Sequence, residues 1–190
     1  MRSDQVLCSL LLSGLLLLGA AVGEATDEVG IFFDRDAEET CISASAMSNV
    51  TSYLILLDPS ASGGVYGWQC ELDCENGSIL SVEYAGGQAI NIAQVPDFIV
   101  GLGNPLPGGS AVELATFSVL VDGAGPVGLY ILPSGSSSEE TPIYADGNDV
   151  GVRLPMTPRT IGAESLVAGI NYPNCMPEAS TWGQVKLIYQ

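Results

Sequence analysis

Histidine is absent from this chain of 190 residues, and basic residues of any kind are scarce. Without histidine, the chain cannot build a Ser–His or Cys–His nucleophile pair, a histidine general base or a histidine metal ligand. Lys186 is the only lysine, and its place in an alternating segment indicates a solvated strand position. No glycine-rich loop is followed by Lys-Ser or Lys-Thr, which excludes the common phosphate-cradling loop.

The shortage of basic residues leaves the chain strongly acidic. Five Lys and Arg residues stand against 22 Asp and Glu residues, a net charge of −17. Such a surface repels phosphates, so we expect neither nucleic acid nor an anionic membrane as a partner. Carboxylates alone would permit a glycosidase, but two tryptophans provide few sugar platforms. A carbohydrate-active enzyme is therefore only the third-ranked hypothesis.

The first residues have the pattern of a secretory signal peptide. Arg2 precedes a leucine-rich apolar run, Leu7 to Val22, and small residues follow around Gly23 and Ala25. The run is short for a membrane span of roughly 20 residues, although a retained membrane anchor is the alternative. We expect a signal peptide over residues 1–23 and one domain over 24–190. The protein would then be extracellular or periplasmic, and would meet a membrane only before cleavage.

Four cysteines remain after that segment: Cys41, Cys70, Cys74 and Cys175. An even number in an oxidising compartment favours two disulfides. Cys70 and Cys74 share a strand face about 13 Å apart at the usual rise, which exceeds the reach of a disulfide. Each is therefore expected to pair with Cys41 or Cys175, in an order that the sequence leaves open. The alternative is that one or both pairs stay as buried thiols.

The clearest strand runs from Val65 to Glu75, because its residues alternate without a break between an apolar and a polar face. Asn76-Gly77 follows and predicts a tight hairpin, with 79–84 returning as the partner strand and Leu80 on its apolar face. Two further segments, 50–57 and 111–121, are apolar on both faces, which predicts central strands.

The remaining segments are short and β-prone, and Gly- and Pro-rich turns separate them. They include 29–33, 89–93, 98–102, 127–132, 143–144, 150–154, 166–170 and 185–189, with loops at 104–109 and 134–140. At most one short helix is expected, near 41–49. Nine to eleven such strands predict an all-β, antiparallel sandwich of jelly-roll or Ig-like type, loop-rich from about residue 134.

The stretch from about Val50 to Pro133 resembles a cohesin-type sandwich. The likeness rests on the aromatic strand 66–72, the strand 78–84, and Leu114-Ala115-Thr116-Phe117-Ser118-Val119 after a Gly-rich loop. The resemblance implies a secreted bacterial jelly-roll or Ig-like module that works by binding. The cysteines and the long segment after Pro133 depart from the cohesin pattern.

Two acidic loops are candidates for structural calcium, and apart from this candidate ion we expect no cofactor. One contains Asp146, Asn148 and Asp149, and the other contains Asp34, Asp36, Glu38 and Glu39. Neither has the complete EF-hand pattern, and Asp146-Gly147 is also typical of a simple turn.

Tyr66, Trp68 and Tyr84 would form a sugar platform if they were exposed, but their positions on apolar strand faces favour the core. The sequence thus favours a non-enzymatic binding or adhesion module at the cell surface, with a protein or glycan partner. The alternative is a structural subunit of an extracellular assembly, joined through strand edges.

Overall fold

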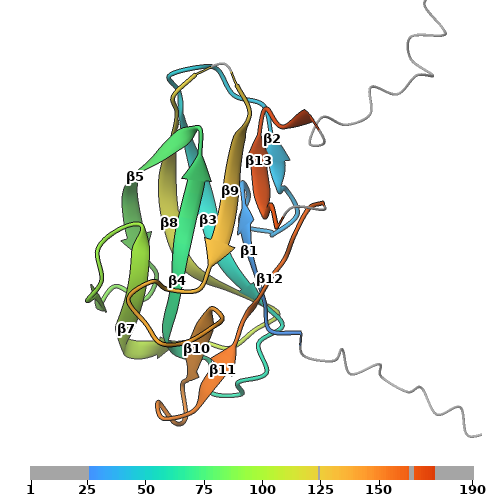
Figure 1. Cartoon of the computed structure of the whole chain (residues 1–190). Coiled ribbons are helices and arrows are strands. Elements are labelled where there is room, and N and C mark those ends of the chain that lie inside the picture. The colour runs from blue at the N-terminus through green and yellow to red at the C-terminus, as the bar shows by residue number, and fades with distance from the viewer. Residues whose placement is uncertain (1–25, 124, 163–164, 174–190) are drawn as a thin grey trace, which may run out of the picture.

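A computed structural model describes residues 26–123, 125–162 and 165–173, and in these residues it contains two β-sheets packed face to face (Figure 1). One sheet has the order β12–β1–β3–β8–β5, with the bounds β12 Thr157–Pro158, β1 Glu28–Phe32, β3 Asn49–Leu57, β8 Ala111–Val121 and β5 Gly77–Tyr84. The other has the order β11–β10–β4–β9–β13–β2, with the bounds β11 Arg153–Pro155, β10 Ile143–Asp146, β4 Val65–Glu75, β9 Val127–Leu132, β13 Ala168–Ile170 and β2 Cys41–Ile42. β7 (Asp97–Leu106) also pairs with β4, and β6 (Ala89–Asn91) pairs with β7.

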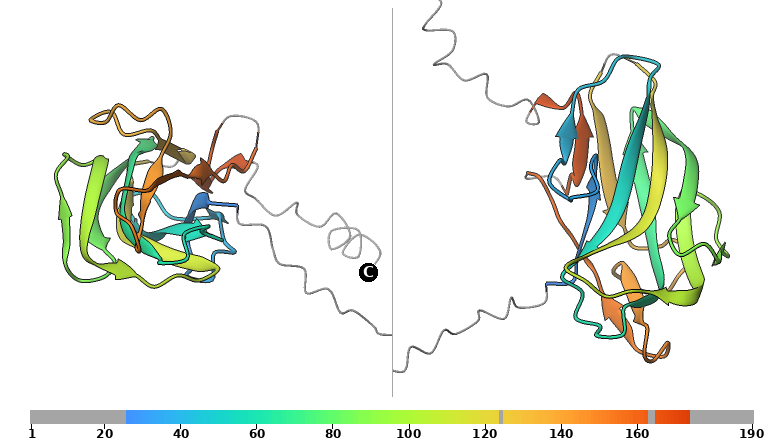
Figure 2. Two further views of the ribbon diagram at one scale, coloured as in Figure 1. Left: turned by 90° about the horizontal axis from the view of Figure 1, so that it is seen from below. Right: turned by 180° about the vertical axis from the view of Figure 1, so that it is seen from behind.

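The apolar side chains between the two sheets form one core, and Figure 2 shows the sheets as two layers around it. Its largest fully buried side chains include Leu54, Phe98, Phe117 and Tyr144. Each such side chain contributes roughly 1.5–3 kcal/mol by its removal from water. The β-sandwich predicted from the sequence is confirmed.

The strands with two apolar faces lie where the sequence places them. β3 runs between β1 and β8, and β8 runs between β3 and β5. Neighbours on both edges satisfy the backbone of each strand, and the second sheet covers one face. β4 has the predicted bounds.

The predicted hairpin at Asn76-Gly77 is wrong. The turn exists, since Asn76 has a φ of 59°, but β4 belongs to one sheet and β5 to the other. A Cβ on Gly77 would lie 2.9 Å from the Leu120 carbonyl oxygen and 3.0 Å from Cys74 Sγ. The glycine is therefore needed where the chain crosses tightly from one sheet to the other, and not for a two-strand hairpin.

The prediction that Leu80 faces the core is also wrong. The register of β5 against β8 shifts between Ile79 and Ser81, which is a β-bulge. The bulge turns Leu80 outward, where it is 53% exposed, while Ile79, Val82 and Tyr84 pack against the core.

Smaller differences concern the ends and directions of elements. The pairs β1–β12 and β13–β2 are parallel, so the sheets are mixed. Residues 41–49 contain the short strand β2 and a turn in place of a helix, and 104–106 extend β7 into the expected loop. The thirteen strands among the described residues exceed the predicted nine to eleven because β2 and β12 have only two residues each. The described residues contain no long apolar helix able to cross a membrane. Residues 1–25 and the predicted strand 185–189 lie outside the described residues.

Candidate functional site: an apolar groove on the outer sheet face

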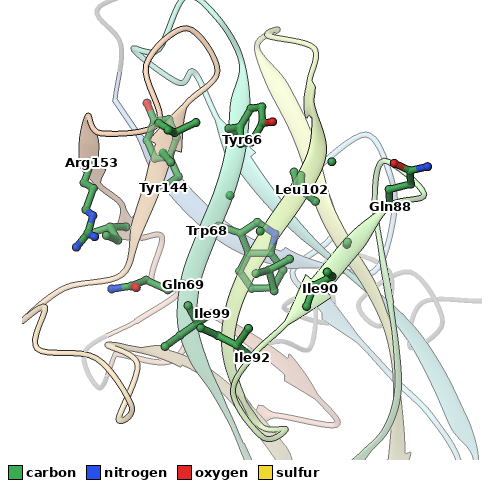
Figure 3. Close-up of a pocket in the computed structure, with 18 residues that line it drawn as sticks. Tyr66, Trp68, Gln69, Gln88, Ile90, Ile92, Ile99, Leu102, Tyr144 and Arg153 are labelled. Atoms are coloured by element: carbon green, nitrogen blue, oxygen red, sulfur yellow. The ribbon is translucent and has the colours of Figure 1, made fainter.

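The outer face of the larger sheet carries a shallow groove of about 800 Å³. β6, β7, β4, β10 and β11 lie next to one another there, and Figure 3 shows the side chains around it. This face is opposite to the core, so the groove is a surface feature and not an interior cavity.

The floor of the groove is bare backbone. Gly67 in β4 lies directly opposite Gly101 in β7, and Ala145 in β10 continues the row on the other side of Gly67. A Cβ built on Gly101 would have no atom within 4 Å. Small residues in neighbouring strands therefore leave a strip of the sheet uncovered.

Aliphatic side chains rise on either side of this floor. Ile90, opposite Gly101 in β6, is 71% exposed, and nearby Ile92 is 77% exposed. In the next row, Ile99 and Ile143 flank Gln69. The exposed isoleucines are large apolar groups that water solvates poorly, which is typical of a contact surface.

Two polar side chains of the groove, Gln69 and Arg153, are engaged with the loop after β9. Gln69 is buried, and its Nε2 donates a hydrogen bond of 2.8 Å to Ser137 Oγ. Arg153 at the rim forms a salt bridge of 2.9 Å with Glu139. The groove consequently offers apolar surface held in a fixed shape.

Trp68 lies in the core below the groove, as the sequence predicts. It is 3% exposed, and its ring centroid lies 5.6 Å from that of Phe98 and 6.2 Å from that of Tyr84. Tyr84 packs against the same core, while the half-buried Tyr66 lines the groove. The three aromatic residues therefore form no exposed platform.

The expectation that Cys70 and Cys74 anchor two disulfides is wrong, because both are free thiols. Cys70 is fully buried on the inner face of β4, and burial raises its pKa well above the ordinary range. Cys74 is half-buried, and burial raises its pKa to about 11. They do not pair with each other, as the strand geometry predicts. Cys41 in β2 is not a free thiol, and Cys175 lies outside the described residues.

The first candidate calcium loop, Asp146 to Asp149, follows β10 directly. Asp146 Oδ1 accepts a hydrogen bond from Asn148 N, and Asp149 Oδ1 accepts one from Gly151 N. Asn148 Nδ2 donates to Ser62 Oγ at 3.3 Å. One oxygen of each carboxylate thus stabilises the turn itself, and calcium at this loop stays a prediction.

The second acidic loop has the same character. Asp34 Oδ1 accepts hydrogen bonds from the amides of Glu38 and Glu39, both at 3.0 Å. Within the described ranges, no group of three or more Cys, Asp or Glu side chains is arranged to hold a metal ion.

No protein-family model matches the chain, and no curated protein matches it. Similar solved structures include a cohesin module of a family 33 glycoside hydrolase from Clostridium perfringens. That module is 8% identical to this chain, with a TM-score of 0.47, and the match covers 72% of this chain and 100% of the module. Another is the second type II cohesin module of the adaptor ScaA scaffoldin of Acetivibrio cellulolyticus. It is 12% identical, with a TM-score of 0.45, and the match covers 85% of this chain and 97% of that one. These chains are cohesin modules, in line with the weak resemblance found in the sequence, but we base the fold on the strand pairing alone.

Reasoning from the sequence missed the groove. The alternation of residues 65–75 puts Gly67 on the polar face of its strand, and Gly101 lies within the predicted strand 98–102. The sequence does contain small residues at outward positions of several strands. They indicate a groove only once the strand register is known to place them side by side.

Proposed function

We propose that the protein is a non-enzymatic binding module whose groove receives apolar side chains from a polypeptide partner with basic flanking residues. The observation that carries the proposal is the bare Gly67–Gly101 floor beside the exposed Ile90 and Ile92. Exposed apolar groups around a fixed depression supply affinity through burial. The depression leaves room for the side chains of a partner.

The chemistry of the walls favours a polypeptide over a glycan. Sugar sites need exposed aromatic rings for stacking, whereas the exposed groups here are isoleucines and Trp68 is buried. Aliphatic walls complement aliphatic or aromatic side chains of a protein.

The charge of the chain favours a basic partner. A net charge of −17 repels a second copy of the same chain and attracts Lys and Arg. Glu139 lies at the Arg153 rim, and Asp146 and Asp149 belong to the same loop as the groove residue Val150. Basic residues beside the apolar segment would meet these carboxylates.

We also infer an extracellular or periplasmic location, with removal of residues 1–23 and a disulfide between Cys41 and Cys175. The apolar run Leu7 to Val22 and the small residues around Gly23 and Ala25 support this location. Because Cys70 and Cys74 are free thiols and Cys41 is not, Cys175 is the remaining cysteine of the mature chain. Mass spectrometry of the secreted protein, with and without reduction, tests both points.

The alternative, a subunit joined through strand edges, has β5 and β6 as candidate edges, because each pairs on one side only. The short β6, the bulge in β5 and the repulsion between acidic copies all oppose it. Light scattering across a range of concentrations tests this, and we expect a monomer throughout.

The groove is tested by peptide selection against a variant in which it is filled. A random-peptide display library is selected on the wild-type protein, and the enriched peptides are compared on Gly101→Val. Valine suits a strand, and its Cβ would have no atom within 4 Å at this position, so the variant should fold normally. Leu80→Ser, which removes an exposed apolar side chain from the other sheet, is the matched control.

We expect enriched peptides to combine apolar residues with Lys or Arg, and to lose at least about tenfold in affinity on Gly101→Val but not on Leu80→Ser. Their binding should weaken as salt is raised. Peptides that bind wild type and Gly101→Val equally would contradict the proposal, as would a library that yields no specific binder.

A further inference from the structure

We propose that a calcium ion binds beside the groove, between Glu71, Asp97 and Ser134, beneath the loop that follows β9. This inference is independent of the partner in the groove. It also concerns neither of the two acidic loops that the sequence indicates.

Two carboxylates face each other at this place. Glu71 in β4 and Asp97 in β7 are directly opposite partners in the sheet. Like charges at such a pair destabilise the sheet unless something compensates them. In the part of the chain that the structure describes, the Arg–carboxylate pairs involve Glu113 and Glu139, so no arginine neutralises Glu71 or Asp97.

The loop after β9 closes over this pair. The amide of Ser136 donates a hydrogen bond of 2.9 Å to Asp97 Oδ2. Gly135 lies against the other carboxylate, since a Cβ on it would be 3.3 Å from Glu71 Oε2. The loop therefore holds the Asp97 carboxylate in place and lies next to the Glu71 carboxylate.

Two buried oxygens in this cluster have no partner. Asp97 Oδ1 and Ser134 Oγ are both inaccessible, and neither makes a hydrogen bond of normal geometry. Ser134 as a whole is 3% exposed. A buried, unpartnered carboxylate oxygen is costly, and its neighbour here is another unpartnered oxygen.

The Ser134 hydroxyl lies beside the Asp97 carboxylate, although the contact lacks the geometry of a normal hydrogen bond. The two buried oxygens without partners are therefore neighbours.

The ligand set selects the kind of cation. Two carboxylates and a hydroxyl are hard oxygen ligands, and calcium accepts six to eight of them in flexible geometry. Loop carbonyls and water would supply the remainder. Magnesium demands a stricter octahedron and gives up its water reluctantly, so it should bind more weakly.

The test measures calcium binding by calorimetry and thermal unfolding of protein first freed of metal with a chelator. Asp97→Asn keeps the size and the Ser136 hydrogen bond but removes the charge. Ser134→Ala removes the unpartnered hydroxyl alone, and it serves if Asp97→Asn folds poorly. Asp149→Asn, in the loop after β10, is the matched control, and magnesium at equal concentration controls for general screening of charge.

We expect saturable calcium binding and a raised melting temperature in the wild type and in Asp149→Asn. Binding should be lost in Asp97→Asn and weakened about tenfold in Ser134→Ala. The proposal is overturned if the wild type does not respond, if magnesium acts equally, or if Asp97→Asn responds like the wild type. It is also overturned if Asp149→Asn, and not Asp97→Asn, loses the response, because calcium would then bind in the loop after β10.

Discussion

Gly67 of β4 and Gly101 of β7 lie directly opposite each other, yet an added side chain would meet a different environment at each. At Gly101 a Cβ meets open space, whereas at Gly67 it would lie 2.7 Å from the Val100 carbonyl oxygen. Gly67 is therefore needed for the two strands to pack closely, whereas Gly101 only keeps the groove open.

The pair predicts opposite effects on stability. Gly67→Ala should destabilise the protein by about 1–3 kcal/mol, because a backbone oxygen cannot move aside cheaply. Gly101→Val should change stability by less than about 1 kcal/mol, or raise it, since valine favours a strand. Urea unfolding of both variants measures this, and equal destabilisation would contradict the assignment.

The two free thiols predict a loss of stability in alkaline solution. The pKa of Cys74 is raised by burial from 9.0 to about 11. Its contribution to stability is therefore full below pH 9, and is lost as the pH rises through the folded value of about 11. The unfolding free energy should fall over that range, and Cys74→Ala should flatten part of the fall.

Thiol labelling provides an independent measurement of the same environment. Cys74 should react slowly at pH 8, and Cys70 should react only when the protein unfolds, because it is fully buried. Rapid labelling of Cys70 in the native protein would show that the inner face of β4 is open.

The tight crossover between the sheets predicts a large effect at Gly77. An alanine there would place its Cβ 2.9 Å from the Leu120 carbonyl oxygen and 3.0 Å from a Val127 methyl carbon. We expect a loss of about 1–3 kcal/mol. Gly125→Ala, where a Cβ meets nothing, is the control, and chemical denaturation compares the two.

The patterns that predicted correctly are local ones. The alternation in β4 and the apolar runs of β3 and β8 reflect which faces each strand buries, and every residue carries that information itself. Asn76 likewise fixes a turn, but the residues around it do not say whether the next strand pairs beside β4 or crosses to the other sheet. That choice depends on β8 and β9, far along the chain.

The groove and the proposed calcium site depend on register between distant strands. Gly67 meets Gly101, and Glu71 meets Asp97, only because β7 aligns with β4 in one specific way. A shift by one residue would move each side chain to the other face. Composition shows that carboxylates are abundant, but it cannot show which of them become neighbours.

A last prediction concerns how the segment before β1 is tied to the larger sheet. Tyr144 in β10 is fully buried, and its hydroxyl donates to Asp27 Oδ1 while accepting from the Ala61 amide at 3.2 Å. Asp27 Oδ1 also accepts from the Ser60 amide at 2.7 Å. One hydroxyl thus joins two segments, and Tyr144→Phe would leave the buried Ala61 amide without this acceptor.

We expect Tyr144→Phe to cost about 1–3 kcal/mol in unfolding free energy. Asp27→Asn should cost less, because the amide oxygen still accepts from Ser60. The double variant should show a coupling of about 0.5–3 kcal/mol, since the two side chains share one network. Tyr53→Phe, on a ring that Arg35 covers at 5.3 Å, is the control for removal of a tyrosine hydroxyl elsewhere. Additive costs for Tyr144 and Asp27 would mean that the contact does not hold these segments together.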